Sequence, residues 1–127
     1  MCNNNCDGIR DILKMIVKLQ KRCGIDDDNM SCDRPFLGGG TNNILNTRPV
    51  SLYTCPSNTL WTMPYTDGEL SGTSSVFRVE KVDGCCATLR VLREEGETLE
   101  ATSSFFTINL NCVGAVRCLP DIYIPCL

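Results

Sequence analysis

The chain has 127 residues, a formal net charge of −3, ten cysteines and no histidine. The absence of histidine excludes Ser-His and Cys-His nucleophilic pairs, imidazole general bases and metal sites with mixed Cys and His ligands. The acidic balance, without a basic cluster, argues against nucleic-acid binding, and no apolar run approaches the roughly 20 residues that span a bilayer.

Residues 1–6 are predicted to form a flexible arm. Three asparagines separate Cys2 from Cys6, and they provide no apolar side chain that would anchor the arm to a domain. The segment also lacks a basic stretch followed by an apolar one, so we expect no secretory signal. Because the chain begins with Met1, we expect it to reach an oxidising environment by a route other than secretion.

A helix is predicted from about residue 7 to residue 22. Asp7 is suited to cap its start and Gly24 to end it. Five apolar residues recur at the spacing of one helix face: Ile9, Ile12, Leu13, Ile16 and Val17. This stripe favours a helix packed on the core of its own domain, with a contact to a partner helix as the alternative.

The segment over residues 24–48 is rich in turn-forming residues and is predicted to be a loop. Its acidic run, 26–29, lacks the alternating ligand spacing and the final glutamate of a calcium loop. Its three glycines, 38–40, are not followed by the lysine and hydroxyl residue of a phosphate-binding loop. Neither pattern therefore predicts a ligand site.

The remainder of the chain, about residues 50–119, is predicted to be β-rich. Alternation places Ala87, Leu89 and Val91 on one face of a strand. Asp83-Gly84 matches a two-residue hairpin turn, because glycine adopts the positive φ that such a turn needs. The expected strands are 50–54, 59–65, 76–82, 86–92, 105–111 and 113–119. We expect a mainly β fold, a single β-sandwich or jelly-roll-like domain over residues 7–127, with one amphipathic N-terminal helix.

The ten cysteines exceed what folding requires, since a chain of this length buries enough surface to form a core. Structural zinc sites usually contain closely spaced cysteine pairs, and no C-x2-C occurs here. No base is visible at a defined spacing from a nucleophile, so we do not expect an enzyme. We expect no metal and no cofactor, and a thiolate metal-binding module is the alternative function.

Cys85 and Cys86 are adjacent, which limits what they can bond to. A disulfide between them is disfavoured, because neighbouring Cα atoms are about 3.8 Å apart and disulfides need more. If both lie on a strand, their side chains point to opposite faces. Two interpretations stay open: one thiol faces the core and the other faces another element or subunit, or a buried thiol lies beside an internally bonded cysteine.

The positions of the remaining cysteines divide them into two groups. Cys2 and Cys6 lie on the predicted arm and Cys126 lies next to the C-terminus, where a side chain can reach a neighbouring subunit or the domain's own core. Candidates for disulfides between subunits are Cys2, Cys6, Cys85, Cys86 and Cys126. Candidates for disulfides within the chain, or for buried thiols, are Cys23, Cys32, Cys55, Cys112 and Cys118.

Several blocks of sequence are shared, in order, with a known family. They are Arg34–Gly38, Asn46–Pro49, Leu52–Thr54, Val76–Val82, Cys85–Leu92 and Ile108–Leu119. Over about residues 30–120, these blocks resemble the CotY/CotZ spore-coat family, which includes the exosporium protein ExsY. In the closing block the family commonly has a further cysteine where this chain has Gly114.

The resemblance implies a structural protein of the outer layers of bacterial endospores, the coat or the exosporium. Members of the family self-assemble into extended, disulfide-cross-linked arrays, some of them crystalline hexagonal layers that are comparable to a capsid array. The implied partners are further copies of the chain and other spore coat or exosporium proteins, without nucleic acid or membrane insertion. The implied location is the spore surface, after synthesis in the mother-cell cytoplasm without a signal peptide. A fibre or adaptor subunit is the alternative to a sheet-forming one.

Overall fold

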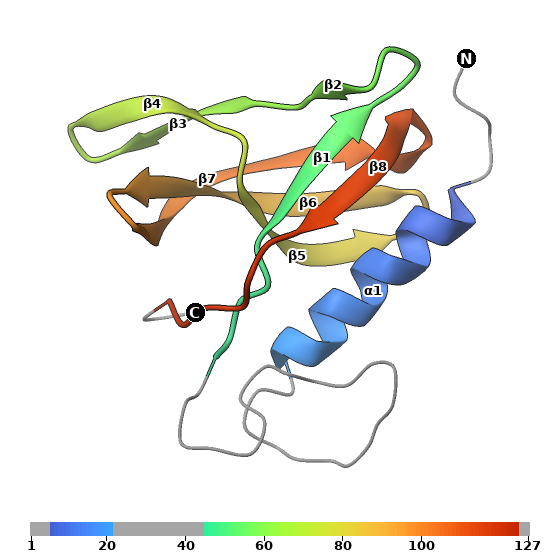
Figure 1. Ribbon diagram of the computed structural model, residues 1–127, viewed down its shortest axis with the longest axis horizontal. Helices are drawn as coiled ribbons and strands as arrows, with labels where there is room; N and C mark the ends of the chain where they lie inside the picture. The colour runs from blue at the N-terminus through green and yellow to red at the C-terminus, as the bar shows by residue number, and fades with distance from the viewer. Residues whose placement is uncertain (1–5, 22–44, 125–127) are drawn as a thin grey trace.

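A computed structural model describes residues 6–21 and 45–124 of the chain (Figure 1). In these residues one α-helix precedes eight strands and a short 3-10 helix. The elements are α1 (Asp7–Lys21), β1 (Val50–Thr54), β2 (Thr59–Leu60), β3 (Met63–Asp67), β4 (Leu70–Ser74), β5 (Phe77–Asp83), β6 (Cys86–Glu95), β7 (Thr98–Asn109), η1 (Leu110–Cys112) and β8 (Val113–Cys118). The predicted mainly β, sandwich-like domain with an N-terminal helix is confirmed.

Helix α1 packs on β5 and β8, as the apolar stripe predicted (Figure 1). The backbone N–H of Arg10 donates to the carbonyl of Cys6 at 2.8 Å, which sets the first turn. Leu13 and Ile16 are buried in the core, but Ile12 of the predicted stripe is 44% exposed. The difference arises because the contact face is centred on Leu13 and Ile16, so Ile12 lies at its margin.

Two antiparallel sheets build the rest of the fold. The larger sheet has the order β2-β1-β5-β6-β7, and β8 pairs with the other edge of β1. The smaller sheet is the β3–β4 ribbon, which packs against β6 and β7. The predicted strand 59–65 is therefore two strands: Trp61 donates its backbone N–H to the carbonyl of Leu52 at 2.9 Å, and the chain then leaves the larger sheet.

The core lies on the inner face of the larger sheet, as the alternation along residues 86–92 predicted. Ala87, Leu89 and Val91 are each at most 1% exposed. Phe77 of β5 is buried beside Phe106 of β7, with ring centroids 4.9 Å apart in an edge-to-face arrangement. These contacts join the helix and the central strands in one hydrophobic cluster.

The hairpin between β5 and β6 differs from the prediction by one residue. Asp83 pairs with Cys86, so the two turn residues are Gly84 and Cys85 rather than Asp83 and Gly84. Gly84 has a φ of +64° at the first turn position, where a type II′ turn requires glycine. Cys85 is therefore in the turn, and the opposite-face argument for two adjacent strand residues does not apply to it.

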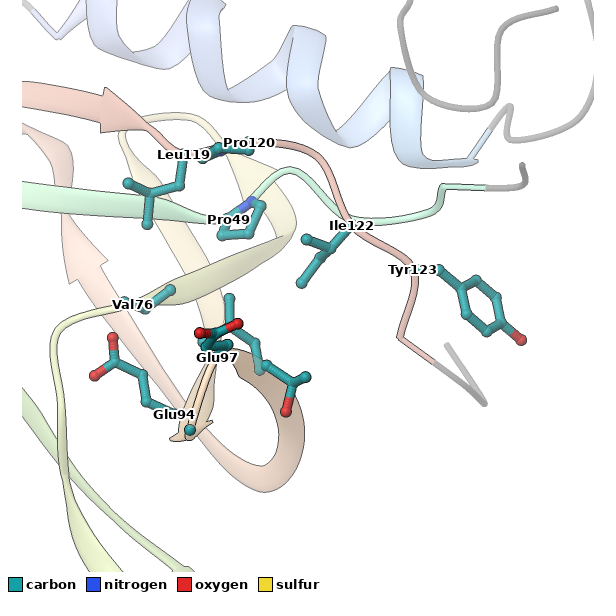
Figure 2. Close-up of a pocket in the computed structure, with 11 residues that line it drawn as sticks. Pro49, Val76, Glu94, Glu97, Leu119, Pro120, Ile122 and Tyr123 are labelled. Atoms are coloured by element: carbon teal, nitrogen blue, oxygen red, sulfur yellow. The ribbon is translucent and has the colours of Figure 1, made fainter. Parts of the chain in front are cut away.

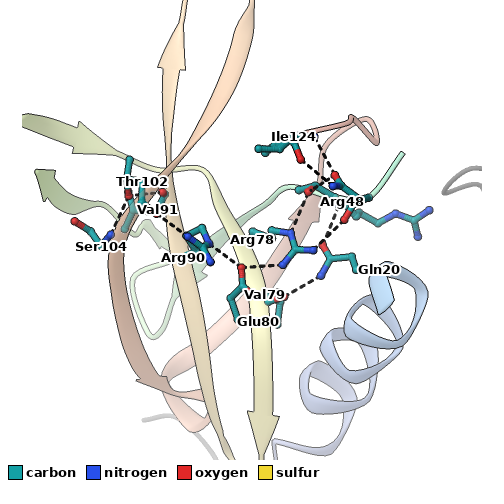
Figure 3. A network of polar contacts seen from close by, with 12 residues as sticks. Gln20, Arg48, Arg78, Val79, Glu80, Arg90, Val91, Thr102, Ser104 and Ile124 are labelled. Atoms are coloured by element: carbon teal, nitrogen blue, oxygen red, sulfur yellow. Dashed lines mark hydrogen bonds and ion pairs between the residues drawn. The ribbon is translucent and has the colours of Figure 1, made fainter. Parts of the chain in front are cut away.

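A buried polar network centred on Arg78 of β5 fixes the segment that leads into β1 (Figure 3). The Arg78 guanidinium donates to Thr47 Oγ1 at 3.0 Å and to the Asn46 carbonyl at 3.1 Å. It also contacts Glu80 at 2.8 Å, and the same carboxylate accepts from Arg90 at 2.9 Å. The buried charge of Arg78 is tolerated because the N–H groups of its guanidinium have hydrogen-bond acceptors and a carboxylate partner.

The same segment also holds the chain that follows β8. The Asn46 amide donates to the Ile124 carbonyl at 2.8 Å and accepts from the Ile124 N–H at 2.9 Å. The Arg48 guanidinium forms a bidentate ion pair with the Asp121 carboxylate, with N–O distances of 2.7 and 2.9 Å. The Arg48 backbone N–H donates to Gln20, whose amide in turn donates to the Val79 carbonyl (Figure 3). Helix, sheet and C-terminal segment are thus joined at one end of the fold.

Candidate cross-linking thiols

Six of the ten cysteines lie in the described residues. Cys6 and Cys85 form a disulfide, and Cys55 is also disulfide-bonded. The other three are free and exposed: Cys86, Cys112 and Cys118. Four sequence candidates, Cys2, Cys23, Cys32 and Cys126, lie outside the described residues.

The Cys6–Cys85 disulfide joins the start of α1 to the β5–β6 turn. The Cα atoms are 6.0 Å apart, within the usual range, and 79 residues separate the two cysteines. Both were candidates for bonds between subunits, whereas the structure bonds them to each other. The physical reason is the docking of α1: Cys6 is 3% exposed and belongs to the core cluster, so it is not on a free arm.

Cys86 is the first residue of β6, directly after the bonded Cys85. It lies opposite Asn109 of β7, and its side chain is exposed and free. Of the two interpretations for this adjacent pair, the structure combines one part of each: Cys85 is bonded within the chain, and Cys86 faces outward. Cys86 therefore keeps its thiol available at the surface.

Cys112 lies at the same end of the sheet as Cys86, in η1. The Leu110 N–H donates to the Cys85 carbonyl at 2.7 Å, which fixes this short helix beside the β5–β6 turn. The Cys55 N–H donates to the Cys112 carbonyl at 3.0 Å. Cys112 was expected to be bonded within the chain or buried, but it is free and exposed because η1 turns its side chain away from the core.

Cys118 lies at the opposite end of β8. The register pairs Cys118 with Val50 and Val113 with Thr54, so β8 separates Cys118 from the end that carries Cys112. Over the strand Val113–Cys118 this separation is about 17 Å. Cys118 was also expected to be bonded or buried, and it too is free and exposed. The three free thiols thus lie at two ends of the domain.

The surroundings of Cys118 control its reactivity. Partial burial raises the pKa of the Cys118 thiol, and the nearby Asp121 carboxylate raises it further, whereas the Arg48 guanidinium acts in the opposite direction. The thiolate is the reactive form of cysteine, so a raised pKa slows its reactions at neutral pH. The Cys118 thiol is therefore exposed to solvent but reacts slowly at neutral pH.

Within 6–21 and 45–124, no group of three or more Cys, Asp or Glu side chains is placed to hold a metal ion. No helix in the described part of the chain is long and apolar enough to cross a membrane.

A family model described as spore coat protein Z matches residues 2–98. This chain belongs to that family. The predicted membership of the CotY/CotZ spore-coat family is confirmed, and with it a structural role in the spore coat at the spore surface. No curated protein and no solved structure matches the chain.

The family match spans seven of the ten cysteines, up to and including Cys86. It ends before η1 and β8, so the resemblance of residues 108–119 to the family's closing motif rests on the sequence blocks alone. Cys112 and Cys118 both lie in that part. The structure is what identifies them as exposed free thiols.

Proposed function

We propose that this protein is a self-assembling structural subunit of the outer spore layers, the coat or the exosporium, and that Cys86, Cys112 and Cys118 join its copies by disulfides. The observation that carries the proposal is the presence of exposed free thiols at both ends of one folded domain. The partners are further copies of the chain and other coat proteins, and the role is structural rather than catalytic.

The position of the thiols suits an extended assembly. Cys86 and Cys112 are at one end of the sheet, and Cys118 is at the other end of β8. A subunit with reactive groups at two ends bonds to two neighbours, which is the minimum for a chain or a layer. A single reactive end produces only dimers.

Each bond between copies is an oxidation. Two thiols lose two protons and two electrons, one S–S bond forms, and molecular oxygen or a small disulfide accepts the electrons. The subunits are then synthesised reduced in the mother cell and oxidised after its lysis. A layer joined in this way does not dissociate unless it is reduced.

The test is assembly of the purified chain with and without reductant. We expect a ladder of high-mass species on a non-reducing gel that collapses to the 14.0 kDa monomer with reductant. Ordered layers or fibres in the electron microscope should accompany the ladder. The variant C86S/C112S/C118S should still fold and should lose the ladder. Monomer in both lanes, with no ordered material, would overturn the proposal.

A further inference from the structure

An apolar groove lies between the β6–β7 hairpin and the segment that follows β8 (Figure 2). Its volume is about 460 Å³, in the range of sites that accept side chains of a ligand or partner. Val76, Leu99, Leu119 and Ile122 belong to a small hydrophobic cluster and line it. The groove therefore offers apolar surface that the domain's main core does not cover.

The groove has an acidic rim. Glu94 and Glu97 line it, both exposed, and Figure 2 shows the two side chains extending from the hairpin toward the apolar residues. Neither glutamate has an ion-pair partner in residues 6–21 and 45–124, and the described lining contains no lysine or arginine. An occupant should therefore combine apolar side chains with positive charge.

The outer face of α1 has these two properties. Ile12 is 44% exposed and Met15 is 38% exposed, one helical turn apart. Lys18 lies one turn from Met15 and Lys14 one turn from Lys18, both exposed, and neither lysine has an ion-pair partner in the part of the chain that the structure describes. The acidic residues of this side, Asp7 and Asp11, are both paired with Arg10, at 3.0 and 3.4 Å. The face is apolar and basic where the groove is apolar and acidic.

We propose that the outer face of α1 of one copy docks into the groove of the next copy, with Ile12 and Met15 against the apolar lining and Lys14 and Lys18 against Glu94 and Glu97. The two surfaces differ, and Figure 1 shows α1 and the β6–β7 hairpin at opposite sides of the molecule. The contact is therefore head-to-tail, a type that continues into filaments or rings. The inference rests on the proposed self-assembly and names its non-covalent interface.

The proposed contact also agrees with the positions of the thiols. Leu119 lines the groove and follows Cys118 directly, while the Cys6–Cys85 disulfide ties α1 to the hairpin that carries Cys86. Docking α1 in the groove brings the Cys118 end of one copy toward the Cys86 end of its neighbour. Assembly then precedes oxidation and selects which thiols meet.

The test is a charge swap, read by sedimentation velocity of the purified full chain. E94K/E97K and K14E/K18E should each raise the concentration for half-assembly by at least about tenfold, because two attractive rim pairs become repulsive. An equimolar mixture of the two variants should restore assembly, since every contact between unlike copies is matched. The fourfold variant should also assemble alone. Salt should weaken assembly of the unmodified chain.

Matched controls separate this interface from a general effect of charge. E69K and K81E reverse exposed charges outside both surfaces and should assemble as the unmodified chain does. If the charge-reversed variants fold and assemble normally, or if the mixture does not recover, the interface is wrong while self-assembly stands. If the unmodified chain does not assemble at all, both the interface and the proposed function are overturned.

Discussion

Arg78 is the residue whose buried side chain joins β5 to the segment that leads into β1. Its guanidinium contacts Asn46, Thr47 and Glu80 and is almost fully buried. Replacing it by methionine keeps much of the side-chain volume but leaves the Glu80 carboxylate and the Asn46 carbonyl with fewer partners. The sequence block Asn46–Pro49 thus has a structural explanation: it supplies the partners of Arg78 and Asp121.

We expect R78M to lower the free energy of unfolding by about 3 kcal/mol, because Glu80 keeps only Arg90 as a charged partner and the buried Thr47 hydroxyl and Asn46 carbonyl lose their charged donor. Urea unfolding followed by circular dichroism measures the change. K81M, an exposed substitution three residues along the same strand, is the control and should stay within about 0.5 kcal/mol of the unmodified chain. An R78M protein as stable as the control would contradict the role given to this network.

Cys118 allows a second prediction at the scale of one residue. Burial and Asp121 raise the pKa of its thiol, so little thiolate is present near neutral pH. D121N removes the negative charge and releases Arg48, and both changes lower the pKa of the thiol. We therefore expect D121N to speed alkylation of Cys118 by iodoacetamide at pH 7.5, measured by mass spectrometry of the modified peptide.

The dependence on pH provides the check on this assignment. The alkylation rate of Cys118 in the unmodified chain should rise as the pH passes above the ordinary thiol range, and D121N should shift that rise to lower pH. E69N, which removes a distant exposed carboxylate, should leave the pH dependence of Cys118 alkylation unchanged. An unchanged profile in D121N would mean that Asp121 does not control the thiol.

Sequence position alone does not correctly separate the cysteines that bond within the chain from those that remain exposed. The sequence places Cys6 at a chain end and Cys118 inside a strand, which suggested an outward and an inward thiol respectively. Docking of α1 buries Cys6 against Cys85, 79 residues away, and the edge position of β8 exposes Cys118. Disulfide pairing depends on such long-range contacts, and no local spacing encodes them.

At the scale of elements, most of the fold followed from local patterns. The helix stripe and the strand alternation have fixed periods, so α1, β1, β5, β6 and the end of β7 were predicted close to their bounds. The division of residues 59–65 between two sheets was missed, because a change of sheet leaves the β pattern intact. The turn at Gly84 was displaced, since Asp-Gly and Gly-Cys both place a glycine where φ is positive.

The Cys6–Cys85 disulfide joins α1 to the β5–β6 hairpin and gives a prediction for these elements. C6S/C85S removes a cross-link that closes a loop of about 80 residues. We expect this double substitution to lower the free energy of unfolding by about 4 kcal/mol. Denaturant unfolding without reductant measures it. C86S, which removes the neighbouring free thiol, is the matched control and should leave stability unchanged. Equal stabilities for the two variants would show that docking of α1 does not depend on the disulfide.

At the scale of the whole molecule, the free thiols of residues 6–21 and 45–124 define two ends. Cys86 and Cys112 share the end at which Leu110 contacts the β5–β6 turn, and Cys118 lies at the end where Arg48 and Asp121 meet. Growth of a covalent assembly requires both ends on every copy. Removing the thiols of either end should therefore shorten the disulfide-linked products without slowing formation of the first disulfide.

We expect C118S and C86S/C112S each to stop at disulfide-linked dimers under conditions in which the unmodified chain forms a ladder on a non-reducing gel. Each variant retains free thiols at one end only among the described residues, so two copies join through that end and the far end of each copy carries no described free thiol to continue the chain. C86S and C112S as single changes are the controls, since each keeps both ends and should still give a ladder. A full ladder from C118S would mean that growth at that end uses a different cysteine, and dimers from either single control would identify the one thiol on which the first end depends.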